Sequence, residues 1–209
     1  MDKLVQKSLA EFETALASED SVPGGGGAAA YTGALGSALC AMASKLTIGK
    51  KKYQEYWADL VVIAENSEKL GNELLALVDE DAEGFAPLAA AYSIPKDDPG
   101  RAETLEKATL TACEGPVRMT EAIAKAIELL EEAKDKSSKL LVSDVACGSI
   151  LCAAALRCAA INVFVNTRTL NDREAAEKID SRVRYLLDTY VPRAKAVADD
   201  IEKYLCERK

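Results

Sequence analysis

Histidine is absent from the 209-residue sequence, and this absence excludes several kinds of enzyme at once. A Ser–His or Cys–His catalytic pair cannot form without it. Six cysteines are present, at positions 40, 113, 147, 152, 158 and 206, but no two are spaced as Cys-x-x-Cys. Structural zinc sites use closely spaced Cys and His ligands, so we expect no metal site. Cysteines scattered through apolar stretches behave as small hydrophobes and indicate a reducing compartment.

The sequence also has no excess of positive charge and no apolar leader. Its 26 Lys and Arg residues stand against 34 Asp and Glu, which gives a net charge of −8 and argues against nucleic acid or an anionic membrane as a partner. The first residues contain no signal-like apolar run, so we expect a cytoplasmic protein. The length fits one domain, residues 1–209, with a sizeable core.

Strand patterns are missing as well, because no stretch alternates with period two between hairpin turns. Apolar residues instead recur every three or four positions, which predicts an all-α, single-domain, multi-helix bundle. The expected helices span about 3–18, 28–47, 53–92, 101–134, 144–166 and 172–206. Pro87, Pro116 and Pro192 are expected to bend the third, fourth and sixth helices.

Two long segments without acidic residues, 28–44 and 145–165, are predicted to be buried helices and not membrane spans. The first is mostly Ala, Gly and Ser, whereas the second contains Arg157 and a late asparagine. A helix with small residues on nearly every face can be approached closely from several sides. We therefore expect these two helices at the centre of a bundle or of a homodimer.

The feature that stands out is a run of four glycines, Gly24–Gly27, directly after Pro23. Glycine permits a tight entry into a helix, and this ordinary role is sufficient to explain the run. The alternative is a binding site, in which the amides of Gly24, Gly25 and Gly26 near a helix N-terminus hold an anion. No Gly-Lys-Ser/Thr ending follows, so a nucleotide-binding loop is not expected.

Two carboxylates interrupt apolar patterns. Asp81 continues the helical stripe of Leu70, Leu74 and Val78, where a buried carboxylate would need a partner. The same spacing also fits a stripe that drifts outward into a solvated acidic turn, because other acidic residues surround Asp81. Asp144 directly precedes an apolar helix, where capping of the first-turn amides is its ordinary role and does not exclude catalysis.

Amide and amine side chains complete the candidate residues. Asn162 and Asn166 share one helix face within an apolar segment, so they either need partners or mark a helix that returns to solvent. Lys50, Lys51 and Lys52 follow the first small-residue helix, where lysines at a helix end are commonly solvated. Alternatively, such a lysine cluster could bind an anion. Lys96, in a later loop, is a further candidate for the same role.

Four ordered motifs spread over nearly the whole chain carry a resemblance. They are Pro-Gly-Gly-Gly at 23–26 with Leu-Thr-Ile-Gly-Lys-Lys at 46–51, Asp-Glu-Asp-Ala-Glu-Gly-Phe at 79–85, Ile-Pro-Lys at 94–96, and Ser-Asp-Val at 143–145 running on to Asn-Val-Phe-Val-Asn at 162–166. In these motifs the chain resembles the cyclodeaminase/cyclohydrolase family of one-carbon folate enzymes. It departs from the common pattern at Gly27, where serine is frequent, and at Pro87, inside a helix that is usually uninterrupted.

The resemblance implies a folate substrate, no cofactor, and roles for particular residues. Asp81 lies at the family's Asp-x-x-x-Phe position, and Asp81 or Asp144 would face a cationic, amidine-like carbon while Lys50 supplies a proton. The glycine turn and the two asparagines would hold the substrate, with the asparagine amides against the pterin edge. Lysines of the 50–52 cluster, Lys51 among them, and Lys96 would bind the glutamate tail.

Two activities fit this resemblance. A methenyltetrahydrofolate cyclohydrolase opens the methenyl ring with water to give 10-formyltetrahydrofolate, and a formiminotetrahydrofolate cyclodeaminase closes that ring and releases ammonia. The sequence contains no formiminotransferase domain, which favours the cyclohydrolase as an expectation. A non-catalytic helical dimerisation scaffold is the alternative of another class, and such a scaffold has no reason to gather Asp81, Asn162 and Asn166 around one cavity.

Overall fold

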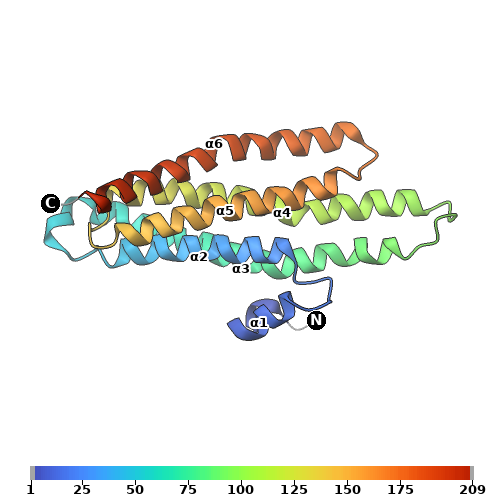
Figure 1. Cartoon of the computed structure of the whole chain (residues 1–209), viewed down its shortest axis with the longest axis horizontal. Coiled ribbons are helices and arrows are strands. Elements are labelled where there is room, and N and C mark those ends of the chain that lie inside the picture. Colours follow the sequence, from blue (N-terminus) through green and yellow to red (C-terminus); the bar gives the residue numbers. More distant parts are fainter. Residues whose placement is uncertain (1–2, 208–209) are drawn as a thin grey trace.

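The computed structural model describes residues 3–207, and within this range every regular element is helical. The elements are η1 (Leu4–Gln6), α1 (Leu9–Leu16), α2 (Gly25–Lys45), η2 (Lys51–Tyr56), α3 (Trp57–Tyr92), α4 (Arg101–Lys136), α5 (Val142–Thr167) and α6 (Arg173–Cys206). The all-α prediction is confirmed. The long helices run side by side along one axis, and the short α1 lies outside them (Figure 1).

The two small-residue helices are the centre of this bundle. Helix α2 packs against α3, α4 and α5, and α5 packs against α2, α4 and α6. Gly36 and Gly148 meet where α2 crosses α5, and a Cβ built on Gly36 would lie 2.9 Å from the Gly148 carbonyl oxygen and would overlap the Cys152 sulfur. The missing side chains are therefore what lets these two helices touch, as the composition predicted.

Apolar stripes from the long helices fill the space around this crossing. The fully buried large side chains include Leu60, Ile63, Leu74, Leu77, Leu88, Met119, Ile123, Ile127, Leu130 and Leu156. Among the described helices, α5 is also the one whose length and composition would suit a membrane span. A core helix meets the same two criteria, and α5 is in contact with three neighbouring helices.

The N-terminal segment differs from the single helix expected over 3–18. Helix α1 begins only after Ser8, whose hydroxyl accepts a hydrogen bond from the Glu11 amide while the Glu11 carboxylate accepts from the Ser8 amide. This reciprocal cap starts a new helix and separates it from η1. The segment is attached to α3 by the Leu4 amide, which donates to Asp79 Oδ1 at 2.6 Å, and to α2 by Phe12, whose ring packs against Tyr31.

The glycine run is part of a helix and not only a turn before it. Gly24 is the residue that precedes α2, and Gly25, Gly26 and Gly27 form its first turn. Gly49 lies in the turn that follows α2. Its φ of 89° is in the left-handed region that favours glycine. Pro87, Pro116 and Pro192 all lie inside long helices, as expected.

The six cysteines are all free thiols, and they divide into two groups. Cys40, Cys113 and Cys152 are buried, as expected of small hydrophobes, whereas Cys147, Cys158 and Cys206 are exposed. Burial raises the pKa of Cys40 and of Cys152 to about 12, so these two thiols stay protonated and chemically inert at neutral pH.

Candidate active site

A cavity of about 190 Å³ opens beside the first turn of α2. Four long helices and the loop before α2 contribute to it, through Ser21, Val22, Gly24, Gly25, Gly26, Asp81, Phe85, Ala112, Pro116, Asn162, Val165 and Asn166. Asp81, Asn162, Asn166 and the glycines thus meet at one place, although they are up to 142 positions apart in the sequence. Asp81 supplies the one charged side chain among the described residues that line this cavity.

The Asp81 carboxylate rests directly on the α2 backbone at Gly26. A Cβ built on Gly26 would lie 2.6 Å from Asp81 Cγ and would overlap both carboxylate oxygens. Gly115 of α4 is close to the backbone of Asp81, since its Cβ would lie 3.6 Å from Asp81 Cα. Glycine on both neighbouring helices therefore makes room for this carboxylate between α2, α3 and α4.

This position makes Asp81 a weaker acid than usual. Burial raises the pKa of Asp81 from 3.8 to about 6, and a hydrogen bond from the Gly27 backbone amide lowers it in part. The first-turn amides of a helix have no partner within the helix, so the start of α2 supplies such donors. A carboxyl group with a pKa near 6 can accept and return a proton at neutral pH.

The two asparagines reach the cavity from the last turns of α5. Asn162 Nδ2 donates to the Cys158 carbonyl oxygen of its own helix at 2.8 Å, and Asn166 Nδ2 donates to the Ala112 carbonyl oxygen of α4 at 3.1 Å. Neither Oδ1 atom accepts a hydrogen bond from any of residues 3–207. Both side chains therefore offer an unused acceptor at the cavity wall.

Asp144 does not share this cavity, and the prediction that it lies there with Asp81 is wrong. Asp144 is in the first turn of α5, 18 residues before Asn162, which corresponds to about 27 Å along the helix. The residue that precedes α5 is Leu141, so Asp144 is not the helix cap either. The helix was predicted correctly. However, the C-terminal end of α5, which carries Asn162 and Asn166, is the end that lies at the start of α2.

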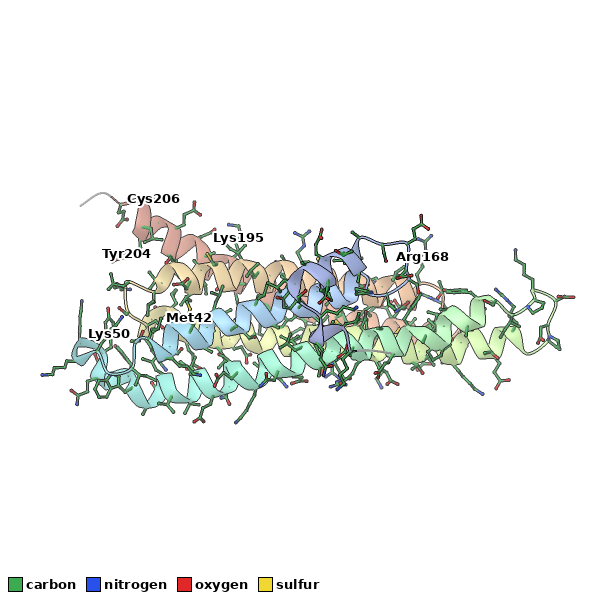
Figure 2. The ribbon with its side chains drawn as sticks, turned by 90° about the horizontal axis from the view of Figure 1, so that it is seen from below. Met42, Lys50, Arg168, Lys195, Tyr204 and Cys206 are labelled. Carbon is green, nitrogen blue, oxygen red and sulfur yellow. The ribbon has the colours of Figure 1, made fainter. Side chains whose placement is uncertain are left out.

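The lysines lie away from the cavity. Lys50 and Lys51 follow the far end of α2, which is 21 residues or about 30 Å long, and Figure 2 shows Lys50 at one end of the molecule and Arg168, which follows α5, well away from it. Lys96 lines a separate hollow of about 350 Å³ with Arg101, Thr109 and Thr169, of which Thr109 lies about one helical turn before Ala112 on α4.

Some lining residues were not singled out by sequence reasoning as parts of a site. Phe85 and Val165 belong to the 79–85 and 162–166 motifs but were given no role in a site, and Ala112 looks like an ordinary small residue of a helical stripe. Pro116 was recognised only as a bend. Among the described residues there is no group of three His, Cys, Asp or Glu side chains that could hold a metal ion.

Together, fold and site define a helical-bundle protein with a desolvated carboxylate and several acceptors around a small cavity, an environment suited to a cationic or N–H-rich small molecule. The chain belongs to the formiminotransferase-cyclodeaminase family, whose sequence profile matches residues 8–185. The resemblance seen in the motifs is thereby confirmed.

Individual relatives carry two kinds of name. The chain is 39% identical over 176 residues to a methenyltetrahydrofolate cyclohydrolase of Methylorubrum extorquens, covering 82% of this chain and 85% of that protein. It is 27% identical to a formimidoyltransferase-cyclodeaminase of Sus scrofa, covering 95% of this chain but only 38% of that longer protein. The crystal structure of formiminotetrahydrofolate cyclodeaminase from Thermotoga maritima superposes with a TM-score of 0.83 at 25% identity, covering 94% of this chain and 98% of that one.

Proposed function

We propose that the protein is an enzyme of one-carbon folate metabolism, a methenyltetrahydrofolate cyclohydrolase that hydrolyses 5,10-methenyltetrahydrofolate to 10-formyltetrahydrofolate. The observation that carries the proposal is the Asp81 carboxylate, held against Gly26 in a cavity without a basic side chain among the described residues. Such an anion favours a cationic ligand, and the bridging carbon of the methenyl compound is cationic. The relative at 39% identity covers most of both chains and supports the same activity.

The proposed reaction uses Asp81 first as a base and then as an acid. The ionised carboxylate takes one proton from a water molecule while the water oxygen forms a bond to the bridging carbon. The C–N5 bond then breaks, N5 receives the proton held by Asp81, and the second water proton leaves to solvent as the formyl C=O forms on N10. A pKa of about 6 suits both transfers, because the ionised and the protonated forms of Asp81 are both accessible near neutral pH.

The direct test follows the absorbance of methenyltetrahydrofolate with purified protein. Rapid loss over the spontaneous rate, with 10-formyltetrahydrofolate as product, supports the proposal. Equal rates with and without protein would contradict it.

A formiminotetrahydrofolate cyclodeaminase is the second candidate, favoured by the similarity to the Thermotoga maritima structure over nearly the whole length of both chains. In that reaction N10 attacks the formimino carbon and gives up its proton to the formimino nitrogen, the bond from the carbon to that nitrogen breaks as it takes a second proton, and ammonia leaves the cationic methenyl compound. The same cavity would serve, with Asp81 protonating the departing nitrogen. The discriminating assay supplies the formimino compound and measures methenyltetrahydrofolate and ammonia together.

We also propose that the protein acts as a homodimer through the outer faces of α2 and α5. Large apolar side chains remain exposed on these two helices and at the residue that follows α2, namely Leu35, Met42, Leu46, Ile150, Ile161 and Val165. Next to them, the groove between α2 and α3 has a volume of about 670 Å³ and is lined largely by small and apolar residues. Exposed apolar area of this extent is typical of an interaction surface. Light scattering at micromolar concentration tests the proposal, and a monomer would contradict it.

For the lysines, we propose binding of the folate glutamate tail. Lys50 and Lys51 follow the end of α2 opposite to the glycine turn, so this role needs a second copy packed antiparallel along α2, whereas Lys96 lines the neighbouring hollow. Replacing Lys50 or Lys51 with Ala should raise KM about 5-fold, more for polyglutamylated substrate and less at high salt. An unchanged KM in both variants would exclude these lysines from tail binding, and an unchanged kcat in Lys50→Ala would exclude proton donation by Lys50.

Compartment and cofactor remain proposals from chemistry. Hydrolysis of an already cationic carbon involves no redox change, so we propose that the reaction needs no added cofactor. Six free cysteines suit a reducing compartment, and we propose that the protein acts in the cytoplasm. Full activity after dialysis against a chelator would support the first proposal. Recovery of the protein in the cytosolic fraction of cells would support the second.

A further inference from the structure

Pro116 leaves one backbone carbonyl of α4 without its helical partner. In a helix, the carbonyl of residue 112 accepts from the amide of residue 116, and proline has no N–H. The proline ring also pushes the carbonyl one turn earlier away from the helix axis. Ala112 is buried, so an unsatisfied carbonyl oxygen there would be costly.

A side chain from another helix supplies the missing donor. Asn166 of α5 donates from Nδ2 to the Ala112 carbonyl oxygen at 3.1 Å, across 54 positions of sequence. All three residues line the candidate active site. The gap that Pro116 creates in α4 is therefore filled by a residue of the site itself.

The other two helix prolines are different. Pro87 and Pro192 are exposed, and no side chain among residues 3–207 donates to the carbonyls of Glu83 and Asp188, four positions earlier. Exposed carbonyls can be hydrated by solvent. The link between a proline gap and a side-chain donor is thus particular to Pro116, which is buried.

We propose that Pro116 is a positioning residue that fixes Asn166 as a hydrogen-bond acceptor in the cavity. One Nδ2 hydrogen of Asn166 is held by α4, which fixes the orientation of the amide and leaves its Oδ1 free to accept, and the Cys158 carbonyl fixes Asn162 in the same sense. Together with Asp81, these side chains place three acceptor groups at the cavity wall, while each asparagine keeps one further Nδ2 hydrogen. Three fixed acceptors favour a heterocycle edge that carries N–H donors at these points.

The inference rests on the proposed function for the identity of the substrate, and the experiment separates the two. Pro116→Ala restores an amide that can bond to the Ala112 carbonyl and draw it back toward the helix axis. Asn166→Leu removes the acceptor, and the double variant combines both changes. Pro192→Ala is the matched control, because it restores a helix amide at an exposed position away from the cavity.

We expect Pro116→Ala to raise KM about 5-fold, the loss of about one neutral hydrogen bond, with kcat changed less than 2-fold. In the Asn166→Leu background the proline substitution should have no further effect on KM, and Pro192→Ala should leave KM and kcat unchanged. A purely structural role for Pro116 would instead give the same change in both backgrounds, and this result would overturn the proposal.

A second measurement does not depend on activity. In NMR spectra of Pro116→Ala, the new amide at position 116 should be protected from hydrogen exchange, and the Asn166 side-chain amide signals should shift. An unprotected amide with unchanged Asn166 signals would overturn the positioning role. If the wild-type protein fails to turn over methenyltetrahydrofolate while these NMR changes occur, the proposed function is wrong and the link between Pro116 and Asn166 stands.

Discussion

Two glycines of α2, ten residues apart, make close contacts of opposite character. At Gly36 the neighbours are the Cys152 sulfur and the Gly148 backbone of α5, and the contact is dry helix packing. At Gly26 the neighbour is the Asp81 carboxylate of α3, beside a cavity. A missing side chain brings two helices together in the first case and brings a carboxylate out of water in the second.

The position along the helix explains the difference. Gly36 is in the middle of α2, where backbone amides and carbonyls bond within the helix, so the contact has no spare donor. Gly26 is in the first turn, where amides have no helical partner and attract an acceptor. The same residue type thus supports stability at one site and, we propose, chemistry at the other.

Removing the carboxylate should have the largest effect, because it makes the Gly26 contact as neutral as the one at Gly36. Asp81→Asn should lower kcat by about 100-fold or more if Asp81 is the general base. Steady-state kinetics on methenyltetrahydrofolate measure this loss. Glu80→Gln is the matched control, since Glu80 is the adjacent acid and pairs with Arg118 outside the cavity; it should change kcat less than 2-fold. Comparable losses in both variants would contradict the role of Asp81.

Filling the Gly26 contact should come next. Gly26→Ala places a methyl group where the Asp81 carboxylate lies, so the carboxylate must move, and we expect kcat/KM to fall by about 100-fold. Gly27→Ala keeps the backbone amide, and its Cβ would lie at ordinary distances of 3.5 Å from Pro23 Cβ and 3.7 Å from Val78 Cγ1. The control should therefore retain activity. Equal activity of the two variants would show that the close approach at Gly26 is unimportant.

Filling the other contact should reduce stability and spare chemistry. Gly36→Ala overpacks the α2–α5 crossing, so the free energy of unfolding should fall by about 1–3 kcal/mol while kcat of the folded protein is unchanged. Gly71→Ala in α3 is the comparison, because its Cβ would lie 3.7 Å from Ser37 Cβ; it should stabilise by about 0.5–1 kcal/mol. Urea denaturation measures both, and a Gly36 variant as stable as the wild type would refute tight packing there.

The smallest effect is the part of the pH dependence of stability that Asp81 contributes. Its folded-state pKa of about 6 exceeds the ordinary value of 3.8, so the folded protein binds more protons between these pH values than the unfolded chain does. The contribution of Asp81 is therefore fully present below pH 4 and is lost as the pH rises through 6. Allowing for partial exposure, Asp81→Asn should gain about 1–2 kcal/mol over the wild type at pH 8 and about none at pH 4. A pH-independent difference would contradict the raised pKa.

The sequence by itself determined the helices and the faces that their residues occupy. The period of three to four residues places Leu70, Leu74 and Val78 on one stripe, all three are buried, and Asp81 follows them into the cavity. Small residues predicted for the same reason that these two helices are closely packed at the centre, since side-chain size and spacing are local properties, and the structure shows that they pack against each other. The capping box of Ser8 and Glu11 is an equally local signal, but the single helix expected over 3–18 did not take it into account.

Only the tertiary structure decided which ends of the helices meet. Helical spacing fixes the direction of a side chain around its own axis, but it does not say which neighbour that direction faces. The end of α5 that carries Asn162 and Asn166 lies at the start of α2, so Asp144 is at the other end of the bundle and Lys50 is far from Asp81. The bond from Asn166 to the Ala112 carbonyl likewise depends on two helices being adjacent at one level, because a proline in a sequence marks a missing donor but not the side chain that replaces it.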